Sequence, residues 1–223
     1  MRNFIFYVFI ATFTLSLSSC EDSTAKQQKI REKAIRDSIQ RREVFVRDSI
    51  AKVEAAEKEK KNAEIIKKYK NLFTEKFDEF RDVTWVQPKN MPKYRNRNGV
   101  YAYFALQDNK PTNFRFVFQY FDDDWLFIKS MIFNIDGENI TISPKMERDN
   151  GSGDIWEWCD AQVLSSGYSD DILESFIKKI AYAKTVKIRL NGSQYYDTRT
   201  MTAKQIETIK AAYEYYLALG GTF

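Results

Sequence analysis

The sequence predicts an α+β protein with a long N-terminal helix followed by a mainly antiparallel sheet with two C-terminal helices. Three observations support this fold class. Between Cys20 and Gln87 the chain contains neither Pro nor Gly, and Lys, Glu, Ala, Arg and Gln dominate, which favours a helix. The following part alternates apolar and polar residues between short turn signals, as antiparallel strands do. Two later stretches carry apolar residues at helical spacing.

The N-terminal helical stretch contains a short internal repeat. Residues 35–39 (IRDSI) recur as residues 46–50 (VRDSI), which is a spacing of 11 residues. Eleven residues make three turns at about 3.67 residues per turn, so the repeat gives a nearly straight or slightly right-handed stripe. Lys58-Glu59-Lys60-Lys61 interrupts it. Three interpretations stay open, namely a single spacer helix, a self-associating coil and partial disorder.

The end of this stretch differs from its beginning. Five apolar residues at spacings of three and four predict a wide apolar helix face that docks on the following domain. They are Ile66, Tyr69, Phe73, Phe77 and Phe80. We therefore expect the globular part to begin near Asn62.

Alternating apolar residues predict the strands of the sheet. The first three span 100–106, 114–120 and 125–135. Asp136-Gly137 is a hairpin signal that leads into a return strand at 140–142. Residues 144–154 are polar and contain Pro and Gly, so a loop is expected there.

The C-terminal part predicts a helix at about 170–182, with Ser169 as its cap and Lys178 and Lys179 in its last turn. Alternation over 186–190 then leads into Asn191-Gly192, a second hairpin signal. Thr202 and Gln205 form a capping-box pattern for a last helix that ends at Gly220-Gly221.

The first twenty residues form a separate element. Arg2 is followed by an uncharged apolar run, Phe4–Leu17, and by Leu17-Ser18-Ser19-Cys20. The run is too short to cross a bilayer, which needs about 20 residues. This arrangement resembles the signal peptide of a bacterial lipoprotein, and the last four residues resemble its lipobox. The resemblance implies cleavage before Cys20, a diacylglycerol thioether on its sulfur and an acylated new N-terminus.

The resemblance also implies an organisation and a location. Residues 1–19 are the expected signal peptide, residues 20–61 a helical spacer and residues 62–223 the α+β globular domain. The expected location is the bacterial cell envelope, with the membrane as a partner through the lipid anchor. Whether the domain faces the periplasm or the outer surface stays open.

Composition excludes several kinds of site. The chain has no histidine, which excludes Ser-His-Asp and Cys-His nucleophiles and the usual zinc ligand sets. We expect no metal and no cofactor, although carboxylate-pair hydrolysis stays open. Cys159 has no disulfide partner once Cys20 carries lipid, so a buried thiol is expected. Residues 82–223 hold 17 Lys and Arg against 18 Asp and Glu, so we expect no nucleic-acid partner.

Two segments of the globular part offer candidate binding residues. In the segment 156–160 (WEWCD), an extended chain places Trp156 and Trp158 on one face, as in aromatic sugar-binding platforms. Core packing of both rings is the alternative. Arg95 and Arg97 belong to a basic loop that could hold an anionic headgroup or a polysaccharide. A solvated loop is the alternative there.

These observations favour a lipid-anchored cell-envelope binding or interaction protein that is non-catalytic and has a protein or glycan partner. The candidate ligand-binding residues are Trp156, Trp158, Arg95 and Arg97. One alternative is a carboxylate-based hydrolase acting on envelope glycans, with Glu157 and Asp160 as a possible pair. Another is a structural lipoprotein that oligomerises through its helical stalk.

Overall fold

The computed structural model of this 223-residue chain describes residues 18–162 and 170–223. Most of the expected signal peptide and the expected cap Ser169 lie outside the described residues. The chain folds as two compact units, of which the first ends at Glu59 and the second comprises Lys60–Phe223. The expected start of the globular domain, Asn62, falls within the second unit.

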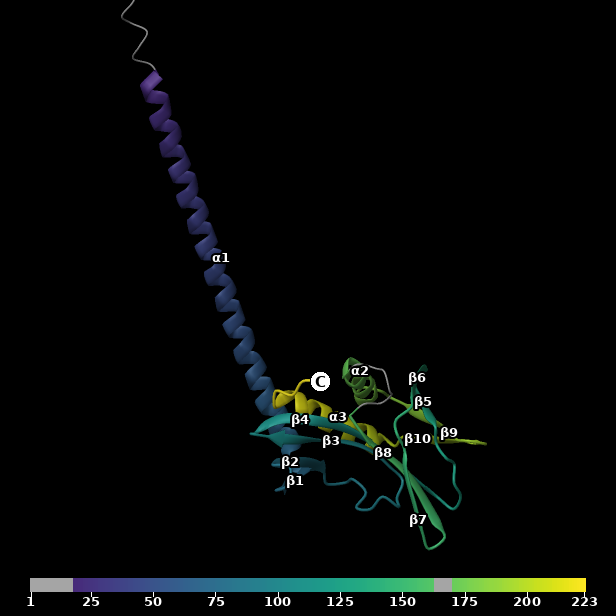
Figure 1. Ribbon diagram of the computed structural model, residues 1–223. Coiled ribbons are helices and arrows are strands. Elements are labelled where there is room, and N and C mark those ends of the chain that lie inside the picture. Colours follow the sequence, from purple (N-terminus) through teal and green to yellow (C-terminus); the bar gives the residue numbers. More distant parts are fainter. Residues whose placement is uncertain (1–17, 163–169) are drawn as a thin grey trace, which may run out of the picture. The chain divides into compact units, whose positions relative to one another are not determined.

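A single helix, α1 (Ser18–Tyr69), forms the N-terminal part of the described chain (Figure 1). Its sequence contains no Pro or Gly, and strong helix formers dominate it. From Thr24 to Glu59 every side chain is exposed except that of Asp37, which is half-buried. This part of α1 therefore draws its helicity from propensity rather than from packing within one chain.

The predicted helix face that continues to Phe80 is wrong. The helix ends at the buried Tyr69, a short 3₁₀ turn (Lys70–Leu72) follows, and strand β1 (Phe73–Asp78) begins. Phe73 is buried in the core, whereas Phe77 and Phe80 are 62% and 93% exposed. A spacing of four residues keeps side chains on one face of a strand as well as of a helix, so it does not distinguish the two.

The predicted α+β class is confirmed, with the strands distributed over two antiparallel sheets. The six-stranded sheet has the order β1-β2-β3-β4-β8-β7 and the four-stranded sheet the order β10-β9-β5-β6. The first sheet adds to β1 the strands β2 (Val83–Pro88), β3 (Gly99–Gln107), β4 (Lys110–Asp122), β7 (Glu147–Gly151) and β8 (Asp154–Ala161). The second contains β5 (Ser130–Ile135), β6 (Glu138–Ile142), β9 (Val186–Asn191) and β10 (Tyr196–Thr200).

Two strand predictions need correction. The expected strand at 125–135 begins only at Ser130, because the backbone before it bonds to a side chain instead of to a neighbouring strand. The expected loop at 144–154 contains β7, which pairs with β8 at the sheet edge. All five residues of β7 are exposed, so no apolar alternation revealed it.

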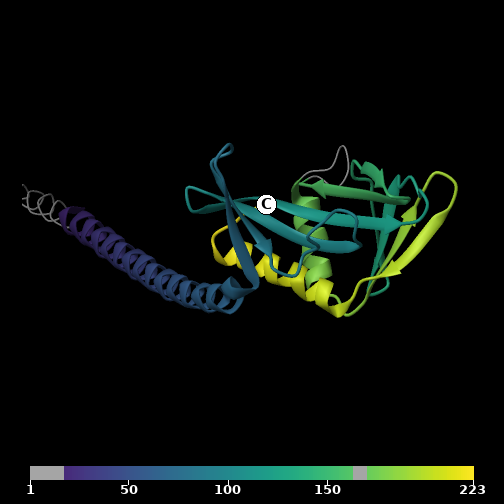
Figure 2. The ribbon, with the colours of Figure 1, turned by 90° about the horizontal axis from the view of Figure 1, so that it is seen from below.

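Two helices cover one face of the six-stranded sheet. Helix α2 (Asp170–Ala181) packs against α3 (Ala203–Ala218), and α3 runs along β3 (Figure 2). The predicted capping box of Thr202 and Gln205 is present with both hydrogen bonds. Phe116, Phe133 and Phe176 meet edge-to-face in the core between the sheets and α2. The inner face of the large sheet thus contributes to the main hydrophobic core.

Candidate binding face on the six-stranded sheet

Strand β8 divides its side chains between two environments. Ile155, Glu157 and Cys159 are buried on the inner face, whereas Trp156, Trp158 and Asp160 are half-buried on the outer face. The alternation of an extended strand explains the division. Both tryptophans therefore share one face, and neither ring belongs to the buried core.

The register with β4 defines the surroundings of the two tryptophans. Trp156 lies opposite Phe121, Trp158 opposite Gln119 and Asp160 opposite Val117. Next to them a second, small apolar cluster forms on the outer face. It consists of Tyr101, Tyr103 and Val117, with Trp85 and Met91 packed against it.

The basic loop, residues 89–98, lies over this outer face. The Asn98 side chain makes two hydrogen bonds to the backbone of Phe121. The Phe121 N–H donates to Asn98 Oδ1 (3.0 Å), and Asn98 Nδ2 donates to the Phe121 carbonyl (3.2 Å). A Cβ at Gly99 would lie 2.7 Å from Cγ of Pro92, so only glycine permits this close approach. The loop is therefore packed against the sheet rather than free in solvent.

Two arginines of the basic loop lie over aromatic rings of the sheet. The Arg95 guanidinium is 5.8 Å from the centre of the Trp158 ring, and that of Arg97 is 5.8 Å from the Phe121 ring. Both distances fall within the range of cation–π attraction. Since Phe121 pairs with Trp156, the structure brings all four predicted residues to one face. We call this set the Arg–aromatic face.

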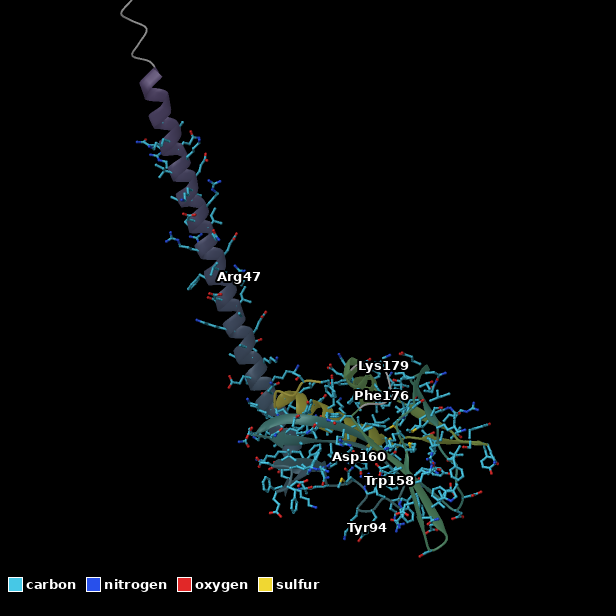
Figure 3. The ribbon with its side chains drawn as sticks, in the orientation of Figure 1. Arg47, Tyr94, Trp158, Asp160, Phe176 and Lys179 are labelled. Carbon is cyan, nitrogen blue, oxygen red and sulfur yellow. The ribbon has the colours of Figure 1, made fainter. Side chains whose placement is uncertain are left out.

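Asp160 is the charged centre of this face. It accepts from Arg95 Nη2 (3.0 Å), Arg115 Nε (2.6 Å) and the Tyr103 hydroxyl (2.8 Å). Figure 3 shows Asp160 and Trp158 on β8, with Tyr94 of the loop nearby and Phe176 on the α2 side. One carboxylate against two guanidinium groups leaves the centre with a positive charge.

The titration behaviour of the neighbours follows from this geometry. Burial and, after it, the charge and hydrogen bond of Asp160 raise the pKa of Tyr103 well above its usual value. Burial alone would lower the pKa of Arg115, but the hydrogen bond and charge of Asp160 outweigh it and raise the pKa. Tyr103 therefore stays a hydrogen-bond donor and Arg115 stays charged at any physiological pH.

Three buried polar atoms at the contact between loop and sheet have no hydrogen-bond partner in the described part of the chain. They are Arg95 Nη1, Asn96 Oδ1 and Gln119 Oε1. A buried group without a partner costs about 1–3 kcal/mol. The polar contacts between the basic loop and the sheet are thus incomplete at this place, although Gln119 Nε2 does donate to the Tyr94 carbonyl at 3.5 Å.

Glu157 has a structural role that the sequence did not reveal. Its carboxylate is fully buried and accepts from three consecutive backbone N–H groups, those of residues 126–128, at 2.7–3.0 Å. Arg148 Nε donates to it at 2.9 Å, and Arg148 Nη2 donates to the Ile128 carbonyl. Glu157 and Asp160 therefore lie on opposite faces of β8, each with its own partners, and do not form a carboxylate pair across one bond.

The segment that Glu157 holds exposes the aromatic ring of Phe127. Phe127 has a φ of +52°, which is rare for a bulky residue, and its side chain is 45% exposed. Its ring stacks on that of Trp125 at 5.5 Å and 18°. The sequence analysis assigned both residues to a strand, whereas the half-buried Trp125 packs against the main core and Phe127 is exposed.

Cys159, on the inner face of β8, is inaccessible to solvent. Cys159 is fully buried, and burial raises the pKa of its thiol to about 12. The thiol therefore stays protonated at neutral pH and is a poor nucleophile.

Residues 18–162 and 170–223 contain no group of three or more potential metal-ligating side chains. Within the same residues, no helix combines the length and the apolar character that a membrane span requires. Comparison with protein-family models, with curated proteins and with solved structures gives no match to this chain.

Proposed function

We propose that this chain is a lipid-anchored protein of the bacterial cell envelope whose globular unit binds an acidic glycan without catalysis. One observation carries the proposal. Arg95 and Arg97 lie over Trp158 and Phe121 on the outer face of the six-stranded sheet.

The residue types on this face match the chemistry of an acidic sugar. A pyranose ring presents an apolar face that stacks on indole and phenyl rings, and Trp156 and Trp158 are both partly accessible. A carboxylate or phosphate substituent accepts paired hydrogen bonds from guanidinium groups, for which Arg97 is exposed. Tyr94 of the same loop, 59% exposed, adds a further ring beside Lys93.

The carboxylates of β8 support binding rather than hydrolysis. A glycosidase needs two carboxyl groups on opposite sides of one scissile bond. Glu157 is saturated by four donors inside the protein, and Asp160 is neutralised by two arginines. The alternative of a hydrolase that uses this pair is therefore not supported.

The anchor is proposed from the sequence. Leu17-Ser18-Ser19-Cys20 after an apolar run resembles a lipobox, and more than one acyl chain gives stable membrane attachment. We expect Cys20→Ser to leave the precursor unprocessed or to release the protein from the membrane. Fractionation together with intact mass measures this, and a variant with the mass and membrane fraction of the wild type would refute the anchor.

The test of the binding proposal is a titration with an array of uronic-acid and phosphate-bearing polysaccharides, monitored by tryptophan fluorescence. We expect Arg97→Gln to weaken binding about tenfold or more, because hydrogen bonds to charged groups contribute about 1.5–3 kcal/mol. Arg81→Gln is the matched control, since Arg81 is a 71% exposed arginine on the β1–β2 turn, outside this face.

Titration with neutral glycans in the same experiment distinguishes binding by ring stacking from binding by charge. The proposal predicts weaker binding to neutral than to acidic polymers. An equal loss for Arg97→Gln and Arg81→Gln, or no response to any acidic glycan, would overturn it.

A further inference from the structure

An exposed apolar stripe follows one side of α1. At about 100° per residue, five large aliphatic side chains fall within about 60° of the helix circumference. They are Ile35, Ile39, Val46, Ile50 and Val53, each 49–58% exposed. The stripe covers about 27 Å of helix at 1.5 Å per residue.

Two serines border the stripe, and neither hydroxyl needs a hydrogen-bond partner outside the helix. The hydroxyl of Ser38 donates to the Ile35 carbonyl (2.7 Å), and that of Ser49 donates to the Phe45 carbonyl (2.8 Å). Each hydroxyl already donates its hydrogen bond within the helix. Burying these two serines therefore leaves no hydroxyl donor without a partner. Their size permits a second helix to approach closely.

The charges beside the stripe are ordered. Arg31 and Arg42 border one side of it and Glu32 and Glu43 the other, so the Arg-Glu pair recurs with the same 11-residue spacing as the apolar residues. Arg36 and Arg47 follow on the acidic side, further from the stripe (Arg47 is labelled in Figure 3).

This order distinguishes the possible orientations of a second identical helix. In a parallel two-fold pair the basic side of one helix lies next to the acidic side of the other, whereas an antiparallel pair brings like sides together. Charge complementarity therefore selects a parallel, in-register second copy as the occupant of the stripe.

We propose that α1 associates with α1 of a second copy of this chain, parallel and in register, through the stripe from Ile35 to Val53. A repeat of 11 residues keeps the seam on one side of nearly straight helices and gives a slightly right-handed supercoil. The stripe holds only five apolar residues per copy, so association is weak in dilute solution and strengthens where copies are concentrated.

The test is disulfide crosslinking of the full chain in bacterial membranes under mild oxidation. Val46→Cys places a thiol in the seam, and Val44→Cys places one on the opposite side of the same helix. We expect at least about fivefold more crosslinked dimer for Val46→Cys, because a disulfide needs Cα atoms within about 7 Å. The unsubstituted chain controls for the native cysteines, and equal yields from the two variants would overturn the proposal.

Charge reversal tests the orientation in the Val46→Cys background. Arg42→Glu and Glu43→Arg should each lower the dimer yield about fivefold, as expected for like charges at the interface, and the two together should restore it. A double variant that crosslinks no better than either single one would exclude the parallel arrangement.

Discussion

Glu157 and Asp160 lie three residues apart on β8, and their surroundings have almost nothing in common. Glu157 is fully buried and fixes the backbone of residues 126–128, whereas Asp160 is partly exposed among arginines and a tyrosine. The alternation of the strand is the whole cause of the difference. The comparison teaches that two neighbouring acids in a sequence can serve structure and recognition separately.

The largest effect should follow from Glu157→Gln. The substitution replaces one acceptor oxygen by an NH₂ group that faces N–H donors, and it leaves Arg148 without its counter-charge. The Arg148 side chain is 35% exposed and stays partly hydrated, so the cost should be about 2–4 kcal/mol. Urea unfolding followed by circular dichroism measures the change in the free energy of unfolding.

Glu147→Gln is the control for that measurement, since Glu147 is exposed on the neighbouring strand β7. Its effect should stay within about 0.5 kcal/mol. A loss below about 1 kcal/mol for Glu157→Gln would show that the inward carboxylate does not organise its segment.

A smaller effect is expected for Asp160→Asn. The amide keeps one acceptor oxygen for Tyr103 or the arginines, and the Arg95 side chain is 38% exposed, so the loss in stability should be about 1–2 kcal/mol. The same change frees positive charge on the outer face, so binding of acidic glycans should persist or strengthen. If Asp160→Asn lowered the free energy of unfolding as much as Glu157→Gln, the two carboxylates would not differ in structural role.

The smallest effect should come from Cys159→Ala, which shortens a buried side chain between the two acids by one atom. We expect a loss of about 1 kcal/mol and glycan binding within about tenfold of the wild type. Labelling with a thiol reagent provides an independent measurement, because the protonated thiol should react in the native protein only as fast as the protein opens. Rapid labelling under native conditions would contradict the burial of Cys159.

Local patterns allowed much of the fold to be predicted from the sequence. The capping box of Thr202 and the hairpin turn at Asp136-Gly137 depend on neighbours in the chain, and each is where it was expected. The second hairpin also forms, but Asn191 still pairs with Tyr196 and the turn comprises residues 192–195. Strand β7 was missed because its residues are polar or Gly and show no apolar alternation. The start of β5 was misplaced because Glu157, 29 to 31 residues away, binds the preceding backbone.

The candidate site was predictable only in part, for a related reason. Arg95 and Arg97 stood out as a dense basic loop, and Trp156 and Trp158 as a strand pattern. Arg115 and Tyr103 belong to other strands and reach Asp160 only through the register of the sheet. A single sequence does not contain that register, so their part in the charged centre could not be foreseen.

The length of α1 determines the local concentration of the globular unit near the membrane. From Cys20 to Tyr69 the 50 residues of α1 extend to about 75 Å. With the acyl anchor proposed for Cys20, the helix restricts what it carries to a half-sphere of about that radius above the membrane, where one molecule corresponds to a concentration on the order of 2 mM. A glycan fixed to the same surface would then be retained even at a dissociation constant of about 1 mM.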